Sequence, residues 1–241
     1  MAEVKGDKYR DHIYGEGEAT TVWKHGAPPN YDVVNKLFEE ERTHVWEKGT
    51  LEERVQRMLK TYEMEMMEIV HKARIQDYKT IDPDGFTFSV NGRAPLNFKQ
   101  IAEIGGSYNF FLQTSLPDKL KVYDPNKETQ QSSHEKFTTA FPRGFAIEIL
   151  HVYSGPPNIV YKFRHWAYME GPFKGHAPTG KKVEFYGMAH FEVDETWKIK
   201  KVEFFFDRGE LLSGLVEGPL LEGTKTEIGS TSMSCPVMKQ I

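Results

Sequence analysis

The sequence predicts an α+β protein in which several helices come first and a curved antiparallel sheet follows. Over much of residues 31–141, apolar side chains recur at every third or fourth position, which is the spacing of a helix face that packs on a core. From Phe145 onward, apolar residues alternate with polar ones, as in strands that bury one face. Helices followed by a run of strands are typical of the α+β class, so we expect residues 31–221 to form a single domain.

A polar extension is expected before this domain and a tail after it. Residues 1–30 contain several Gly and Pro residues, and we expect Tyr9, Tyr14 and Trp23 to pack on the domain and order part of the extension. Residues 222–241 are rich in Thr, Ser and Gly, which predicts a flexible C-terminal tail.

Two helices are expected at the start of the domain, over residues 31–46 and 50–74. Thr50 and Glu53 match a capping box, in which each side chain accepts a hydrogen bond from the other residue's backbone N–H. The second helix is rich in methionine, and Met66 is assigned to a ligand-binding role because methionine is flexible and polarizable. The alternative for these methionines is the filling of an ordinary core.

The middle of the chain predicts short elements separated by turns. Asp-Pro-Asp-Gly and Asn-Gly sequences mark two of the turns, because these residues adopt the backbone angles that tight turns need. The expected elements are a strand at 75–80, a strand at 86–90, a helix at 97–113 that is interrupted at Gly105 and Gly106, a loop at 114–127 and a helix at 132–141.

The sheet is expected to contain four strands, joined by short links into an antiparallel meander. They lie at 145–152, 159–169, 183–192 and 198–207. Many of the 31 aromatic residues (16 Phe, 11 Tyr and 4 Trp) fall within them. A curved sheet needs such bulk on its concave face, and a pocket for an apolar ligand would be lined by the same side chains.

The charge balance and the single cysteine exclude several classes of protein and site. The 31 Lys and Arg residues nearly cancel the 35 Asp and Glu residues, whereas a general nucleic-acid binder needs a basic surface. Cys235 has no second cysteine to pair with, which excludes an intrachain disulfide and a Cys-x-x-Cys metal site. The nine histidines lack metal-ligand spacing, so no metal is expected, and there is no P-loop or Gly-x-Gly-x-x-Gly motif to bind a nucleotide cofactor. The polar start and the absence of an apolar run of ~18 residues predict a cytoplasmic protein with no membrane span.

Residues 171–215 resemble the C-terminal half of the SnoaL-like polyketide cyclases, a group with the nuclear-transport-factor-2-like fold. The shared features are a Gly-rich loop, a Pro-Thr-Gly turn, a long strand, a charged hairpin and a last strand that ends in Asp before a short helix. Over residues 6–221, the chain more closely resembles the plant pathogen-related proteins. The motifs that carry this resemblance include WKHGAPPNYDVVNKLFEEERT at 23–43, FSVNG at 88–92, SSHEKFTTAFPRGFA at 132–146 and VYSGPP at 152–157.

The resemblance implies a cone-shaped α+β domain, in which N-terminal helices pack on a curved antiparallel sheet and the mouth between them is a pocket. The group includes cyclases, isomerases and dehydratases that need no cofactor, and also binding modules that catalyse no reaction. The plant family is linked by its name to responses to attack. A fold does not decide among these roles, so they have to be weighed on individual residues.

Asp207 and His165 are the candidate catalytic residues. In the SnoaL-like cyclases, the Asp at the end of the matching strand acts as acid and base, so the resemblance gives this role to Asp207. His165 shares a strand face with Tyr161 and Phe163, and beside Asp207 it would complete a proton-transfer pair. The alternatives are that Asp207 caps the helix that follows it and that His165 is a hydrogen-bonded core residue.

Seven residues are predicted to bind a ligand. Most of them are aromatic residues of the strands, because these would line a pocket on the sheet. Tyr186 and His190 are included from the other face of their strand. The seven are Met66, Tyr161, Phe163, Phe185, Tyr186, His190 and Phe205.

Three functions are compatible with these features. The first is a binding or accessory protein of plant defence or specialised metabolism, which holds an apolar metabolite of the terpenoid or polyketide class and assists a membrane-bound oxygenase. The second is a cofactor-free isomerase or cyclase that uses Asp207 and His165. The third is an interaction module that forms a symmetric homodimer through its outer sheet face. We favour the first, because spacing alone fixes no acid–base pair.

Overall fold

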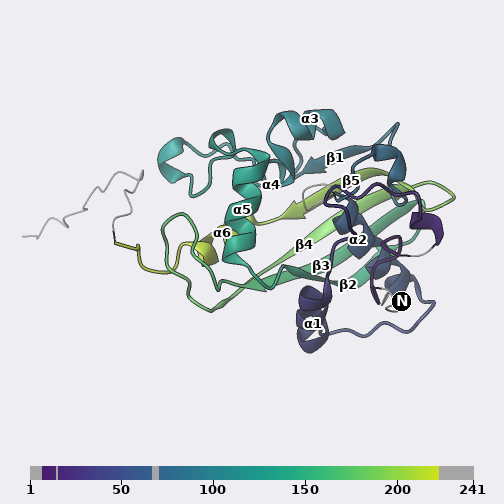
Figure 1. Cartoon of the computed structure of the whole chain (residues 1–241), viewed down its shortest axis with the longest axis horizontal. Helices are drawn as coiled ribbons and strands as arrows, with labels where there is room; N and C mark the ends of the chain where they lie inside the picture. Colours follow the sequence, from purple (N-terminus) through teal and green to yellow (C-terminus); the bar gives the residue numbers. More distant parts are fainter. Residues whose placement is uncertain (1–6, 15, 67–70, 223–241) are drawn as a thin grey trace, which may run out of the picture.

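The computed structural model describes residues 7–14, 16–66 and 71–222 of the chain. Its centre is a five-stranded sheet with the strand order β1-β5-β4-β3-β2, against which the helices pack (Figure 1). The predicted α+β class is confirmed. The strands are β1 (Thr87–Val90), β2 (Ala146–Ser154), β3 (Asn158–Tyr168), β4 (Lys182–Val193) and β5 (Ile199–Phe206).

The four long strands, β2 to β5, pair antiparallel with their neighbours, as predicted. β1 corresponds to the strand predicted at 86–90. It pairs in parallel with β5 and so adds a fifth strand to the sheet, whereas the predicted sheet contained only the four antiparallel strands. Parallel neighbours need a long crossover, and here the crossover contains the other three strands. The register is fixed in part by Gly187, because a Cβ at this position would collide with the ring of Phe163 on the neighbouring strand.

The helices gather at two places on the sheet (Figure 1). α1 and α2 pack near β2, whereas α6 packs on β4 and α4 and α5 pack on each other. Among the described residues, no helix is long and apolar enough to cross a membrane. The helices are α1 (Asp32–Glu41), α2 (Leu51–Met66), α3 (Phe98–Glu103), α4 (Gly106–Phe111), α5 (Gln130–Ala140) and α6 (Arg208–Leu215).

The prediction of a strand at residues 75–80 is wrong. Residues Ile75–Asp77 form a 3-10 turn, and the backbone N–H groups of Lys79 and Thr80 donate to the carboxylate of Glu65. These N–H groups are therefore satisfied by a side chain rather than by a neighbouring strand, so the segment does not join the sheet as an extended strand.

The helix expected at 97–113 is interrupted at Gly105, as predicted. It is divided into α3 and α4, because Gly105 between them adopts a left-handed φ of 88°. The helix expected at 31–46 ends at Glu41. The helix expected at 50–74 corresponds to α2 as far as Met66, and residues 71–74 are not helical. Residues 67–70 lie outside the described residues, as do the last 19 positions (223–241) of the predicted tail.

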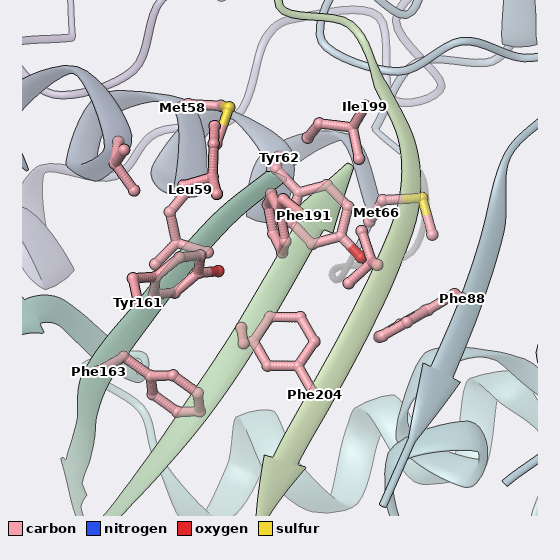
Figure 2. Close-up of a cluster of buried hydrophobic side chains, with 14 of the residues drawn as sticks. Met58, Leu59, Tyr62, Met66, Phe88, Tyr161, Phe163, Phe191, Ile199 and Phe204 are labelled. Carbon is pink, nitrogen blue, oxygen red and sulfur yellow. The ribbon is translucent and has the colours of Figure 1, made fainter. Parts of the chain in front are cut away.

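The concave face of the sheet carries an aromatic core that α2 covers (Figure 2). The ring of Tyr62 on α2 meets those of Phe191 and Phe88 edge-on, with centroids 5.1 and 6.4 Å away. Phe204 joins them from β5, 5.9 Å from Phe191. Met66 lies in this core and is 5% exposed, so it has the position expected of a core-filling residue.

A buried ion pair ties the end of α2 to the sheet. The Glu65 carboxylate is fully buried and accepts hydrogen bonds from Lys72 Nζ at 2.9 Å and from the backbone N–H groups of Lys79 and Thr80 at 2.7 and 2.9 Å. The carbonyl of Thr80 in turn accepts the N–H of Ile199 on β5 at 2.8 Å. A continuous path of hydrogen bonds therefore joins the helix to a central strand.

A second buried ion pair lies on the outer face of the sheet. Arg164 on β3 is buried and pairs with Glu148 on β2, at 3.2 Å, and with Glu184 on β4. Glu148 also accepts the backbone N–H of Thr43 at 2.8 Å, so the segment after α1 crosses this face and covers the arginine. The burial of Arg164 depends on this covering segment.

Removal of the Glu65 carboxylate is expected to destabilise the whole domain. In Glu65→Ala, Lys72 loses one of its two buried carboxylate partners, with Glu18 remaining at 3.1 Å, and the backbone N–H groups of Lys79 and Thr80 and the Thr80 hydroxyl lose their acceptor, so the free energy of unfolding should fall by about 3–5 kcal/mol. Glu52→Ala on the same helix is the control, since Glu52 is partly exposed and should cost less than about 1 kcal/mol. Urea unfolding followed by circular dichroism measures both, and equal losses would contradict the role given to Glu65.

Candidate functional site

A cavity of about 140 Å³ lies between the helices and the concave face of the sheet. Strands β2 to β5 contribute to its floor, α2 lines one side, and α4, α5 and α6 line the other. Arg10 of the N-terminal segment and Tyr31 and Val34 at the start of α1 also line it. The space exists because the two groups of helices cover different parts of the sheet.

Phenylalanine rings from several helices and strands make the walls apolar. The centroids of Phe185 and Phe206 lie 5.1 Å apart, and those of Phe145 and Phe185 lie 5.8 Å apart. Phe111 of α4 is 6.1 Å from Phe206 and 5.7 Å from Phe204. Rings at these spacings offer faces and edges for the rings or methyl groups of a ligand, as small-molecule sites generally do.

One acid–base pair is set into these apolar walls. His165 Nε2 on β3 lies 3.3 Å from Glu63 Oε1 on α2, and both side chains are 18% exposed. The imidazole is held between the rings of Phe145 and Phe185, with centroid distances of 4.3 and 5.2 Å. Both phenylalanines line the cavity, so the imidazole is fixed at its wall.

The second ring nitrogen of this histidine has its hydrogen-bonding capacity unused. Nδ1 of His165 is buried and has no hydrogen-bond partner in the described part of the chain. When Glu63 accepts a hydrogen bond from Nε2–H, the neutral imidazole carries a lone pair on Nδ1. This nitrogen can then accept a hydrogen bond, or a proton, from a molecule in the cavity.

Asp207 lies elsewhere. It is exposed, it caps α6 by accepting the N–H of Gly209 at 2.7 Å, and it is not a lining residue of the cavity. The carboxylate beside His165 is that of Glu63, so the predicted pairing of His165 with Asp207 is replaced by another pair. The alternative interpretation of Asp207, a helix cap, is the role that its geometry supports.

The predicted ligand-binding residues fall into two sets. Phe163 and Phe185 line the cavity. Tyr186 and Phe205 lie on the outer face and are about half exposed, because side chains alternate along a strand and their neighbours face inward. His190 is also on that face, where it bonds to Glu203 at 3.0 Å and Asn158 at 2.9 Å. Tyr161 and Met66 are buried in the core beside the cavity rather than in its lining.

Sequence reasoning missed Glu63 and Tyr62. Together with Leu59 they occupy positions i, i+3 and i+4 of α2, which share one face of a helix. A glutamate next to the apolar stripe of a core-facing helix was a signal that could have identified Glu63. Its partner could not be identified in this way, because the two residues are far apart in the sequence.

Arg10 is a second polar residue that sequence reasoning did not assign to the site. Its Nη1 donates to Asn35 Oδ1 at 2.7 Å and to Asp7 Oδ2 at 3.4 Å. The guanidinium lies 3.6 Å from the centroid of the Tyr31 ring, and the side chain is 2% exposed. Arg10 is therefore a buried cation in the cavity wall, fixed from two sides.

No group of three or more His, Cys, Asp or Glu side chains that could hold a metal ion occurs among the described residues. The chemistry that the arrangement itself offers is hydrogen bonding through His165, Glu63 and Arg10 and proton transfer through His165 and Glu63, in apolar surroundings.

One relative shows the family of the chain. The pathogen-related protein of Hordeum vulgare is 52% identical over 240 residues, which cover 99% of this chain and 97% of the relative. The chain belongs to the pathogen-related proteins. A scan against protein-family models finds no match.

Solved structures similar to the chain include two proteins that are named as polyketide cyclases. A SnoaL-like polyketide cyclase from Jannaschia is 15% identical, with a TM-score of 0.39, over 73% of this chain and 100% of that one. A polyketide cyclase from Acidithiobacillus ferrooxidans is 13% identical, with a TM-score of 0.41, over 72% and 100%. An NTF2-like protein from Anabaena variabilis is 12% identical, with a TM-score of 0.34, over 69% and 96%.

A buried lysine lies near Arg10 and Glu63 of the cavity wall. Lys60 of α2 is 1% exposed, and its Nζ lies 3.7 Å from the centroid of the Phe38 ring. Burial lowers the pKa of Lys60 from 10.5 to about 7, with the nearby positive charge of Arg10 adding to the effect. The carboxylate of Glu63 opposes the shift. Near neutral pH, the amine is therefore partly uncharged in the folded protein.

The lysine gives the stability of the protein a pH dependence with a defined sign. The pKa of Lys60 is lower in the folded than in the unfolded chain, so the unfolded chain binds more protons between pH 7 and 10.5, and stability rises with pH in that window. Lys60→Met removes this effect. The free energy of unfolding of Lys60→Met, relative to that of the unchanged protein, should therefore be highest at pH 6 and lower by about 2–3 kcal/mol at pH 9.

Urea unfolding at pH 6, 7.5 and 9 measures this difference. Lys36→Met is the control, because Lys36 is exposed and forms only a 3.8 Å pair with Glu40, so its effect should not vary with pH in this range. A Lys60→Met effect of the same size at all three pH values would show that the amine stays charged in the folded protein.

Proposed function

We propose that the protein binds a small, mostly apolar metabolite in the cavity on the concave face of its sheet and holds one polar group of that metabolite at His165. The observation that carries the proposal is the open Nδ1 of His165 in a wall of phenylalanine rings. Apolar walls with a few fixed polar groups are typical of small-molecule sites. A buried nitrogen with no partner in the described chain costs free energy that a ligand hydroxyl would recover.

The volume of the cavity restricts the part of the ligand that it holds. Apolar cavities of about 150 Å³ hold one benzene ring. A cavity of 140 Å³ therefore fits a single ring or a branched unit of about five carbons. Within the terpenoid and polyketide classes, this favours a monocyclic compound, or one ring of a larger compound whose remainder extends from the mouth.

A role in plant defence follows from the family name of the relative and is part of the proposal. Transfer of the ligand to a membrane-bound oxygenase, a cytoplasmic location and a homodimer through the sheet stay predictions. The outer face offers Tyr186 and Phe205, each about half exposed, as contacts for such a dimer.

A second candidate function is supported by the contact between Glu63 and His165. A carboxylate that orients an imidazole, with the other ring nitrogen open, is an arrangement that supports general base catalysis. The cofactor-free isomerase or cyclase predicted with Asp207 would use Glu63 in its place. His165 Nδ1 would take a proton from a carbon next to a carbonyl group and return it to the same or a conjugated carbon.

Binding is tested with toluene and p-cymene by isothermal titration calorimetry of the full chain. Both should bind with a negative change in heat capacity, because apolar surface is buried. Leu211→Trp places an indole in the cavity and should weaken binding at least tenfold, whereas Leu120→Trp, at an exposed position outside the cavity, should leave it unchanged. Absence of binding to the unchanged protein, or equal binding by both variants, would contradict the proposal.

Proton transfer is tested by the exchange of methyl protons of acetophenone for deuterium in D₂O, followed by NMR. If the second function holds, the protein accelerates exchange, His165→Gln abolishes the acceleration, and Glu63→Gln lowers it by about tenfold or more. His190→Gln is the matched control, because His190 forms a similar pair with Glu203 on the outer face. If acetophenone binds but its protons exchange no faster than in buffer, the second function is contradicted and only the binding function remains.

A further inference from the structure

We propose that Arg10 of the N-terminal segment is a ligand-recognition residue, and that its Nε–H donates a hydrogen bond to a neutral carbonyl oxygen of a single-ring ligand. This inference rests on the proposed function, since it names the chemical class of molecule that the cavity takes. It also assigns part of the binding site to residues that precede the first long helix.

The inference starts from an unsatisfied donor. Arg10 lines the cavity, and its Nε is buried with no hydrogen-bond partner within residues 7–14, 16–66 and 71–222. Its Nη1 is already bonded to Asn35 and Asp7. Buried N–H groups without partners are rare in native proteins, and such a donor in a cavity wall is accounted for by an acceptor that the ligand brings.

The segment that carries Arg10 is fixed to the body of the protein. Tyr9 packs edge-on against Phe38 at 5.1 Å, and the backbone N–H of Asp11 donates to Thr61 Oγ1 on α2 at 3.0 Å. Ile13 is almost completely buried. The guanidinium is therefore held in place before a ligand arrives, and binding would cost little ordering of this side chain.

The charges around Arg10 favour a neutral oxygen over a carboxylate. The Asp7 carboxylate pairs with the guanidinium and also accepts Asn35 Nδ2 at 3.0 Å, so the positive charge of Arg10 is already compensated. Glu63 adds a carboxylate to the same wall, and burial lowers the pKa of Lys60 to about 7, so that lysine is only partly charged. A second anion would have no spare cation of full charge to pair with.

A carbonyl oxygen meets these conditions. It is an acceptor with no proton of its own, it needs one donor, and it adds no charge to the cavity. Attached to a single ring, it leaves the rest of the ligand apolar, to match the phenylalanine walls. Hydrocarbons of the same shape would fit the walls but leave the Arg10 Nε–H without a partner.

Acetophenone and ethylbenzene are the probes, because they differ by one carbonyl oxygen. Affinities are measured by isothermal titration calorimetry for the full-length protein and for Arg10→Met, which keeps an apolar stem and loses the donor. Arg10→Met should weaken acetophenone binding by about tenfold or more and leave ethylbenzene binding nearly unchanged. Benzoate should bind more weakly than acetophenone to the unchanged protein.

Arg57→Met is the control for loosening of the segment. Arg57 holds the same segment from outside the cavity, through the carbonyl of Lys8 at 2.9 Å and the carboxylate of Asp11. It should affect both probes equally or not at all. If Arg10→Met weakens both probes to the same degree, or neither, Arg10 is structural and the inference is overturned. If no probe binds the unchanged protein, the proposed function itself fails.

Discussion

The fully buried carboxylate of Glu65 is the constraint on which the position of α2, and with it the cavity, depends. A charge in such a place is tolerated only when its oxygens are satisfied, and here Lys72 Nζ and the N–H groups of Lys79 and Thr80 satisfy them. Because the segment that carries Thr80 bonds to Ile199 of β5, these hydrogen bonds fix the end of α2 against the sheet. That position puts Tyr62 and Glu63 at the cavity wall.

The cavity follows from how a curved sheet is covered. α2 packs on one part of the concave face, and α4, α5 and α6 pack on another, so neither group fills the space between them. Large rings such as Phe145, Phe185 and Phe206 narrow that space without closing it. Smaller side chains would leave a wide cleft and a less stable core, so the aromatic content of the chain serves the packing and the site together.

Local patterns predicted only some of the strand residues that face the cavity, and not which residues meet across it. Alternation along the strands places His165, Phe163 and Phe185 on the inner face, whereas Phe205, which was also predicted to bind the ligand, lies on the outer face by the same rule. Glu63 could not be assigned to His165, because the contact joins residues 102 positions apart and depends on how α2 lies on the sheet. The parallel pairing of β1 with β5 is equally non-local, and the motif that pointed to Asp207 did not reveal that capping uses its carboxylate.

At three places in the protein a glutamate pairs with a lysine or histidine, and the three pairs differ in whether every nitrogen has a hydrogen-bond partner. This difference distinguishes a structural pair from a candidate functional one. Glu65 and Lys72 are buried and fully bonded, as a structural pair must be. His190 bonds through both ring nitrogens on the outer face. Of these three, only the pair of Glu63 and His165 lies in the cavity wall and leaves a buried nitrogen without a partner in the described part of the chain. An apolar replacement there would remove the cost of a buried nitrogen without a partner, and this cost is the argument for the ligand proposed above.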